Sequence, residues 1–201
     1  MAKSQNGYSA NDVNQTQVWR IPGTVRDVRL RKGDAGYLLT HLAAWFDKHV
    51  EDIEAGQLDD WGYASRTIRG SSTDLSNHAS GTAIDLNATK HPLGKRNTFT
   101  AQQAAAIRTQ LKVYDGAIRW GGDYVNRADE MHFEINASAA KVAKVAAALK
   151  TPKPNTNTVW ARVRADILAA LNSADAKKVT TRRRKALLDV TRRTFNATKK
   201  Y

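Results

Sequence analysis

Two short stretches carry the most informative residues of this chain: SNHASGTAID at residues 76–85 and DEMHFE at residues 129–134. The first stretch contains His78 and Asp85, and the second contains His132. Two imidazoles and one carboxylate form a three-ligand zinc set that leaves the fourth position of a tetrahedral ion open for water. An open position is typical of a catalytic rather than a structural site. The two stretches therefore predict a catalytic metal centre.

Alternating hydrophobicity places two of these ligands on one side of a sheet. Residues 82–87 and 131–136 alternate with period two, as expected for strands with one face on the core. Asp85 and His132 fall on the opposite, cleft-facing side from the apolar residues, which are Ile84, Leu86, Met131, Phe133 and Ile135. Taken alone, His78 and Asp85 fit an ordinary loop histidine and an exposed strand carboxylate. The second stretch, with His132 on the same inferred face, favours the metal site.

An acid three residues before the last histidine supplies the remaining chemistry. Asp129 could take a proton from the water and hand it to the leaving amine, which predicts a hydrolase. Glu130 is equally close in sequence and stays open as the alternative base. The simplest alternative is that Asp129 is an ordinary acidic loop residue without a catalytic role.

The surrounding pattern predicts an α+β fold with a small antiparallel sheet flanked by helices. Apolar residues recur at three- and four-residue spacing from Asp34 to about Ala55, which predicts an amphipathic helix. A capping box at Thr100–Gln103 begins a second helix to about Val113, and an Ala-rich third helix is expected from Ala137 to Lys150. A further strand is expected at residues 117–120.

Composition divides the chain into two parts. Residues 151–158, TPKPNTNT, predict a linker, because two prolines and a polar run neither continue a helix nor offer much to bury. Residues 1–150 are the expected catalytic domain, and residues 159–201 a small basic helical tail. The 201 residues include no cysteine, so any metal must use His, Asp or Glu.

The basic character belongs to the tail. The net charge is +13, and residues 151–201 carry 13 Lys and Arg residues against three acids, whereas residues 1–150 carry 19 against 16. We expect the tail to bind an anionic cell-wall polymer or an anionic membrane. Nucleic acid is disfavoured because the tail has only three aromatic residues, Trp160, Phe195 and Tyr201, for base stacking. A solvated basic tail without a partner is the third interpretation.

Both stretches resemble the M15 family of peptidoglycan metallopeptidases. Residues 76–85 are similar to the family's Ser-x-His-x-x-Gly-x-Ala-x-Asp signature, residues 129–134 to its second motif, and Trp120-Gly121-Gly122-Asp123 to the stretch before it. The family includes D-alanyl-D-alanine carboxypeptidases and phage L-alanyl-D-glutamate endopeptidases, and its superfamily includes lysostaphin-type enzymes and hedgehog. The resemblance spans roughly residues 63–136.

The resemblance implies a role for each site residue. It implies Zn²⁺ held by His78, Asp85 and His132, with Asp129 as the catalytic acid and base, although some relatives carry Glu at that position. It also implies an upstream arginine that binds a substrate carboxylate or stabilises the carbonyl, for which we favour Arg69 over Arg66. The remaining expectations are Ser76 as a hydrogen-bond donor to the site, Glu134 as the residue that orients a ligand, and His91 as a lesser candidate ligand or substrate contact.

The resulting hypothesis is a zinc peptidase that cleaves an amide of the peptidoglycan stem peptide. Lacking an apolar leader and any apolar run of membrane-spanning length, the chain is expected to be made in a host cytoplasm and to act at the cell wall after release, as a phage endolysin. We expect a monomeric L-alanyl-D-glutamate endopeptidase, with D-alanyl-D-alanine carboxypeptidase as the enzymatic alternative. Alternatives of another class are a non-catalytic metal-binding protein and a nucleic-acid binder driven by the tail.

Overall fold

The fold is given by a computed structural model that describes residues 2–151, 165 and 189. Internal contacts divide the chain into two units, residues 1–150 and 151–201, and the following account concerns the first. The expected tail helices and nearly all of the expected linker lie outside the described residues.

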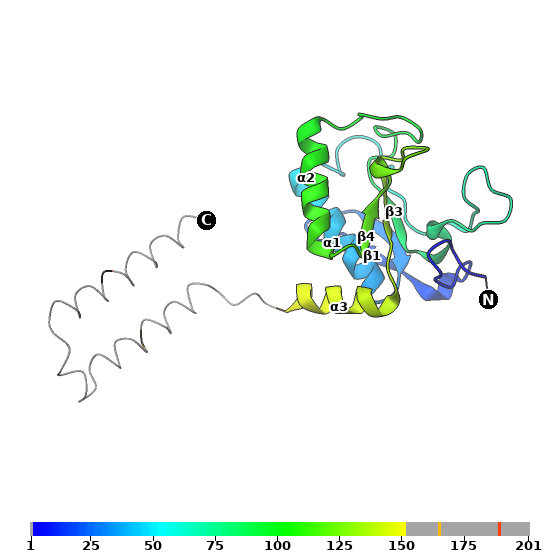
Figure 1. Cartoon of the computed structure of the whole chain (residues 1–201), viewed down its shortest axis with the longest axis horizontal. Helices are drawn as coiled ribbons and strands as arrows, with labels where there is room; N and C mark the ends of the chain where they lie inside the picture. The colour runs from blue at the N-terminus through cyan, green and yellow to red at the C-terminus, as the bar shows by residue number, and fades with distance from the viewer. Residues whose placement is uncertain (1, 152–164, 166–188, 190–201) are drawn as a thin grey trace. The chain divides into compact units, whose positions relative to one another are not determined.

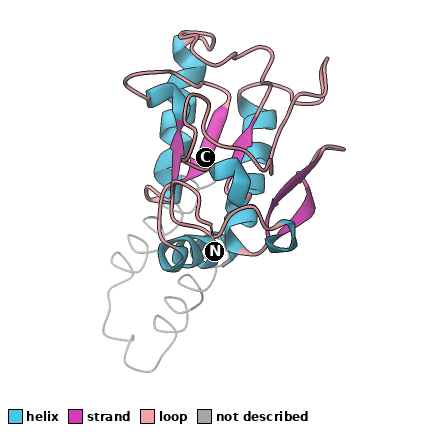
Figure 2. Ribbon diagram, turned by 90° about the vertical axis from the view of Figure 1, so that its right-hand side faces the viewer, coloured by secondary structure: helices cyan, strands magenta, loops and turns pink. Residues whose placement is uncertain are grey.

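Unit 1 is a mixed α+β fold, which confirms the predicted fold class (Figures 1 and 2). Its helices are α1 (Asp34–His49), α2 (Ala101–Leu111) and α3 (Ala139–Lys150). One antiparallel sheet has the strand order β3 (Ala83–Asp85), β5 (His132–Ile135) and β4 (Ile118–Trp120). A separate antiparallel hairpin consists of β1 (Thr16–Arg20) and β2 (Asp27–Arg31). Short 3-10 turns are η1 (Val13–Gln15), η2 (Asn77–Ser80), η3 (Lys112–Tyr114) and η4 (Gly121–Asp123).

The core lies between α1 and the three-stranded sheet. Helix α1 packs against both β5 and α3, and the rings of Phe46 and Phe133 meet edge to face at 5.9 Å. Of the apolar strand residues predicted to face the core, Ile84, Leu86, Phe133 and Ile135 are fully buried, whereas Met131 is 7% exposed. Because these side chains face the core, the side chains of the candidate ligands lie on the opposite face of β3 and β5.

Helix α1 begins where the sequence predicts but ends at His49, so the predicted extension to about Ala55 is wrong. After Val50 the chain is held by side chains instead. Asp47 accepts a hydrogen bond from the Ile53 amide at 3.1 Å, and Asp52 accepts from the amides of residues 54 and 55. Aspartate side chains that bind nearby amides compete with helical hydrogen bonds, which explains the early end. Ile53 remains fully buried although it lies outside the helix.

The other two helices follow the sequence pattern closely. Thr100 and Gln103 form the predicted capping box at the start of α2, which ends at Leu111 and continues as the 3-10 turn η3. Helix α3 begins at Ala139, two residues later than expected.

The β1–β2 hairpin was not predicted. On β2 the alternating residues Val28 and Leu30 are buried, while Val18 on β1 is 55% exposed. Pro22 and Gly23 lie in the connection, where turn residues are expected. The hairpin therefore covers one side of the core with β2 and leaves much of β1 exposed.

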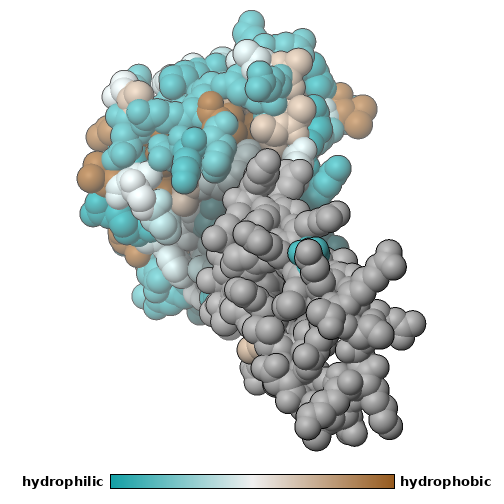
Figure 3. Space-filling view, turned by 90° about the vertical axis from the view of Figure 1, so that its left-hand side faces the viewer, coloured by the Kyte–Doolittle hydropathy of each residue, from teal (hydrophilic) through white to brown (hydrophobic). Residues whose placement is uncertain are grey.

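The described surface is mainly hydrophilic on the face drawn in Figure 3, where apolar side chains occur in small scattered groups. Among the described residues, no helix has the length and apolar character needed to cross a membrane.

Candidate metal centre

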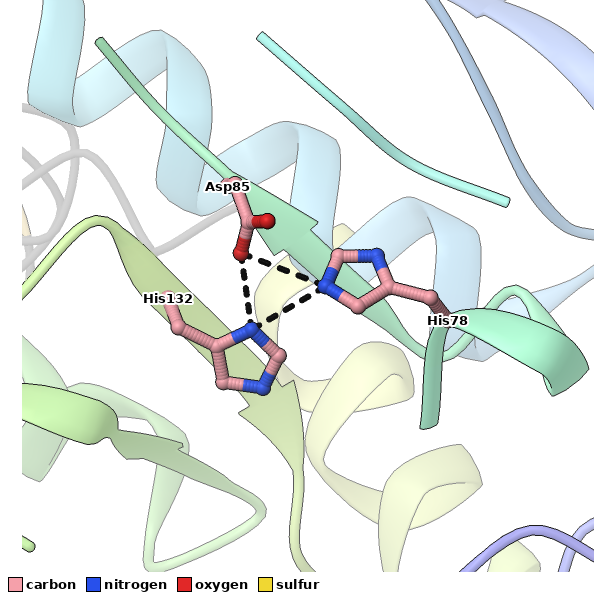
Figure 4. Close-up of side chains that lie close together, drawn as sticks. All are labelled: His78, Asp85 and His132. Atoms are coloured by element: carbon pink, nitrogen blue, oxygen red, sulfur yellow. Dashed lines mark hydrogen bonds and ion pairs between the residues drawn. The ribbon is translucent and has the colours of Figure 1, made fainter. Parts of the chain in front are cut away.

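Three side chains converge on one point at the end of the sheet. His132 Nδ1 lies 2.7 Å from Asp85 Oδ1, His78 Nε2 lies 3.2 Å from the same oxygen, and the two ring nitrogens are 3.1 Å apart (Figure 4). All three side chains are buried. The cluster joins residues separated by up to 54 positions in the chain, as the sequence analysis predicted.

Local structure explains how each ligand reaches this point. Asp85 and His132 are cross-strand partners on β3 and β5, so their side chains leave the same face of the sheet. His78 lies in the turn η2, whose first amides are capped by Ser76: its hydroxyl accepts a hydrogen bond from the His78 amide at 3.3 Å. Ser76 thus supports this turn as a hydrogen-bond acceptor, and the expected role of its hydroxyl as a donor to the site stays a prediction.

The hydrogen bonds behind the two imidazoles fix which nitrogen faces the centre. A carbonyl oxygen can only accept, so His78 Nδ1 carries the proton and donates to Gly62 at 2.6 Å. His132 donates from Nε2 to Glu134 Oε2 at 3.1 Å. In the neutral rings, the remaining nitrogens, His78 Nε2 and His132 Nδ1, present lone pairs to the common point, which is the arrangement found behind metal-binding histidines.

Close backbone packing brings the Gly62 carbonyl to His78. A Cβ atom at Gly62 would lie 2.1 Å from the carbonyl oxygen of Arg29 on β2, a distance that no side chain tolerates. Glycine is therefore required where the chain passes over the hairpin on its way to the imidazole.

The donor set fits a tetrahedral divalent ion. Bonds of about 2.0–2.1 Å place neighbouring ligand atoms of tetrahedral zinc about 3.3 Å apart, close to the separations of the three candidate ligand atoms. The surrounding charges also favour a cation. Burial opposes a charge on His132, but hydrogen bonds to Asp85 and Glu134 outweigh this effect and raise the pKa of His132 to about 10. Positive charge is stabilised at this point, whether it is a proton on His132 Nδ1 or a metal ion that replaces that proton.

Glu134 is the centre of a buried hydrogen-bond network that the sequence did not reveal. Its carboxylate accepts from Asn77 Nδ2, from Arg119 Nε, and from the Tyr124 hydroxyl at 2.5 Å, in addition to His132. Burial opposes ionisation, but these donors hold the pKa of Glu134 below its ordinary value. The carboxylate therefore stays ionised and accepts a hydrogen bond from the His132 ring, while its role in orienting a metal ligand stays a prediction.

A cavity of about 470 Å³ opens beside the metal centre. Its lining includes the candidate ligand His132, the neighbouring acids Asp129 and Glu134, and the turn residue Ser76. Its positively charged members are Arg66, Arg69, Arg119 and Arg127, and its aliphatic members are Ile68, Leu93, Val125 and Met131. The cavity thus combines apolar walls with an excess of positive charge.

The structure separates the two neighbouring acids, Asp129 and Glu130. Asp129 lines the cavity, and its Oδ1 atom is buried without a hydrogen-bond partner among the described residues. Burial, with the nearby Asp85 charge, raises the pKa of Asp129. Glu130 instead accepts hydrogen bonds from the amides of Asn97, Thr98 and Phe99. Of these two acids, Asp129 alone has a buried oxygen without a hydrogen-bond partner in the part of the chain that the structure describes.

The two candidate arginines differ in their surroundings. Both Arg66 and Arg69 line the cavity, and the charge of Arg69 lowers the pKa of Asp129, against the larger opposing effect of burial. His91 lies elsewhere: its ring bonds Thr98 Oγ1 at 2.8 Å and Glu51 Oε2 at 3.1 Å, and it stacks on Phe99. Its place in this separate network removes His91 from the candidate metal ligands.

Comparison with known families agrees with this geometry. Residues 69–135 match the family described as D-alanyl-D-alanine carboxypeptidase, among the M15 peptidases. The match supports an M15 family peptidase. It spans the turn η2 and the strands β3, β4 and β5, and so includes all three candidate ligands and Asp129. No curated protein and no solved structure shows a significant match to the chain.

Proposed function

We propose that the chain is a zinc peptidase that cleaves an amide bond in the stem peptide of peptidoglycan. The bond we favour joins L-alanine to D-glutamate, and the biological setting we favour is a phage endolysin acting on the host wall. The observation that carries the proposal is the convergence of three ligand atoms, with the other nitrogen of each imidazole held by a hydrogen bond, next to an acid with an unsatisfied oxygen.

The residues present suit amide hydrolysis. When bound at this centre, zinc supplies a Lewis acid that polarises a carbonyl and lowers the pKa of water. Asp129 Oδ1 accepts a proton from the attacking water, and the resulting carboxylic acid then protonates the amine that leaves. Glu134 keeps the His132 lone pair directed at the centre throughout. Arg69 is placed to bind a substrate carboxylate or the carbonyl oxygen.

The charge of the cavity supports an acidic substrate. Four arginines line it, and among the described residues Arg127 makes no hydrogen bond or ion pair, so its guanidinium is available for an anion. Cleavage between L-alanine and D-glutamate places the free carboxylate of D-glutamate on the leaving side, with any further acidic residues after it. When a terminal D-alanine is removed, the leaving side carries only one carboxylate, that of D-alanine itself. Because Arg119 is paired with Glu134, three arginines remain for substrate carboxylates, and this number favours the endopeptidase over the carboxypeptidase alternative.

The products distinguish the two activities. Purified peptidoglycan is treated with the zinc-loaded protein, and the released fragments are weighed by mass spectrometry. The proposal expects fragments with a new N-terminal D-glutamate or D-isoglutamine. Freed D-alanine would establish the carboxypeptidase instead, and the absence of any cleavage product would favour a non-catalytic metal-binding protein.

For residues 151–201 we propose attachment to an anionic wall polymer or membrane, on the basis of their charge. Removing these residues should abolish pelleting with purified walls or anionic vesicles while hydrolysis of a soluble muropeptide continues. The alternative of a nucleic-acid-binding protein would be supported by two results together. The full chain would show no hydrolytic activity, and it would bind nucleic acid only when residues 151–201 are present.

A further inference from the structure

The N-terminal arm, residues 2–10, lies outside the region that matches the peptidase family, yet it packs directly on the turn that carries His78. The Gln5 amide donates to the carbonyl of Leu75 at 3.0 Å, and Ser4 Oγ donates to Ser80 Oγ at 2.8 Å. Figure 1 shows the dark-blue arm beside this turn. The arm is therefore a structural neighbour of the metal centre despite its distance in sequence.

Asn6 joins the arm to both ligand-bearing strands. Its side-chain Nδ2 donates to Thr82 Oγ1 at 2.8 Å, just before β3, and to the Ile135 carbonyl at 2.9 Å, at the end of β5. These two bonds fix the position of Asn6, so its backbone amide is also held in place. That amide donates to Asn77 Oδ1 at 3.0 Å.

This contact decides the orientation of the Asn77 side chain. A backbone amide can only donate, so it must meet the oxygen of the Asn77 side-chain amide and not its nitrogen. The nitrogen, Nδ2, is then turned towards Glu134, where it donates to Oε2. The reverse orientation would place an oxygen against a buried carboxylate and a donor against a donor. Asn6 thus selects the one orientation of Asn77 in which Glu134 gains a hydrogen bond.

The same Glu134 oxygen accepts the hydrogen bond donated by His132 Nε2. A continuous path of hydrogen bonds therefore runs from the arm to a candidate metal ligand: Asn6, Asn77, Glu134, His132. Outer residues that hold a ligand in this way alter metal affinity when they are removed.

The residue before Asn6 reaches the substrate side. Gln5 is exposed and lines the cavity, and its side chain makes no hydrogen bond to another described residue. A side-chain amide carries both a donor and an acceptor, which matches the two hydrogen-bonding groups of a substrate peptide bond.

We propose that the N-terminal arm completes the active site, with Asn6 as a positioning residue for His132 and Gln5 as a contact for a peptide bond of the substrate. The inference rests on the zinc peptidase function proposed above. It assigns a role at the site to a segment that the family match does not contain.

Zinc affinity tests the role of Asn6. Full-length wild type and Asn6→Ala are stripped of metal, and zinc binding is measured by competition with a chromophoric chelator. We expect Asn6→Ala to bind zinc about 10- to 100-fold more weakly. Lys3→Ala is the matched control, because this exposed side chain of the same arm makes no hydrogen bond or ion pair to another described residue. Equal affinity in the Asn6→Ala and Lys3→Ala proteins would overturn the role.

One further variant and one further measurement distinguish a role of Asn6 in positioning His132 from a general loss of structure. Asn6→Asp keeps the shape of the side chain and loses the two donated hydrogen bonds, so it should weaken zinc binding without leaving a cavity. The increase in Tm on adding zinc is compared for every variant. A purely structural role would lower Tm equally with and without zinc, whereas the positioning role requires the zinc-dependent increase to shrink as well.

Kinetics with a soluble muropeptide test the role of Gln5. Loss of one hydrogen bond to substrate should raise KM about two- to tenfold in Gln5→Ala and leave zinc affinity unchanged. A KM equal to that of Lys3→Ala would contradict the substrate contact. Wild-type protein that binds no zinc or cleaves no peptide would instead refute the proposed function, so the two failures are distinguishable.

Discussion

Gly121 and Asp129 are in direct backbone contact. The Asp129 amide donates to the Gly121 carbonyl at 2.9 Å, and a Cβ atom at Gly121 would lie 2.4 Å from the Asp129 carbonyl oxygen. The same Asp129 carbonyl accepts from the His132 amide at 3.0 Å. The glycine therefore sets the position of the proposed base relative to the candidate metal ligand His132, which follows it.

Replacing Gly121 with Ala should displace Asp129, because the clash is with rigid backbone rather than with a flexible side chain. Misplacement of a reacting group by a fraction of an ångström to one ångström lowers rates by on the order of 10- to 100-fold. We expect kcat/KM for a soluble muropeptide to fall by this amount in Gly121→Ala. Unchanged kcat/KM in a folded Gly121→Ala protein would show that the position of Asp129 does not matter.

Asp129 and Glu130 provide a matched pair of variants. Asp129→Asn should lower kcat by about 10²- to 10⁴-fold, because the general base is lost, while the zinc content stays that of wild type. Glu130→Gln should keep kcat but lower the free energy of unfolding by about 1–3 kcal/mol, since this carboxylate holds the amides of residues 97–99. Zinc analysis, steady-state kinetics and urea unfolding measure these effects. The reverse pattern would make Glu130 the base.

Removal of the metal should lower stability as well as activity. An ion that binds the folded state at 100 times its Kd adds about 2.7 kcal/mol to the free energy of unfolding. Chelation should therefore lower Tm and abolish hydrolysis, and added zinc should restore both. In Asp85→Asn the zinc-dependent increase in Tm should be much smaller, because the only anionic ligand is lost. A Tm that does not respond to zinc in wild type would argue against the site.

Carboxylate recognition can be tested with amidated substrates. If the arginines of the cavity bind the free carboxylate of D-glutamate, stem peptides with D-isoglutamine should have a higher KM than those with D-glutamate. Arg127→Gln should reduce this difference, since Arg127 has no ion-pair partner among the residues the structure describes. Affinity of the inactive Asp129→Asn protein for both peptides, measured by calorimetry, gives the same comparison without turnover. Equal binding of the two peptides by wild type would refute carboxylate recognition.

His91 should make the fold sensitive to mild acid. Burial lowers the pKa of His91, although Glu51 opposes this effect, so the folded pKa lies below the value of about 6.5 in an unfolded chain. As pH falls through about 6.5, the unfolded state binds the proton first, and the free energy of unfolding decreases. Urea unfolding of the zinc-loaded protein between pH 7 and pH 5 should show a steeper loss in wild type than in His91→Gln. An equal loss of stability with falling pH in the two proteins would show that His91 is not the source of the acid sensitivity.

Periodicity accounts for what the sequence predicted correctly. The alternation around Asp85 and His132 placed both on one face, and their pairing across β3 and β5 confirms it. The capping box of α2 was equally visible, because its two partners, Thr100 and Gln103, are three residues apart. Patterns of this kind depend only on near neighbours in the chain.

Features that depend on tertiary contacts were not visible. The donors to Glu134, among them Asn77 and Arg119, come from segments far apart in sequence. The end of α1 depends on Asp47 accepting from the amide of Ile53, which competes with an otherwise good helical pattern. The β1–β2 hairpin was visible in part, because the alternation of Val28 and Leu30 is typical of a strand with one buried face.

The most direct test of the central claim is the location of the metal. Crystals grown with one equivalent of zinc are measured on both sides of the zinc absorption edge. We predict a single anomalous peak within about 2.0–2.2 Å of His78 Nε2, His132 Nδ1 and an oxygen of Asp85. A zinc peak elsewhere, or none between these three side chains in a protein that hydrolyses peptidoglycan, would contradict the account.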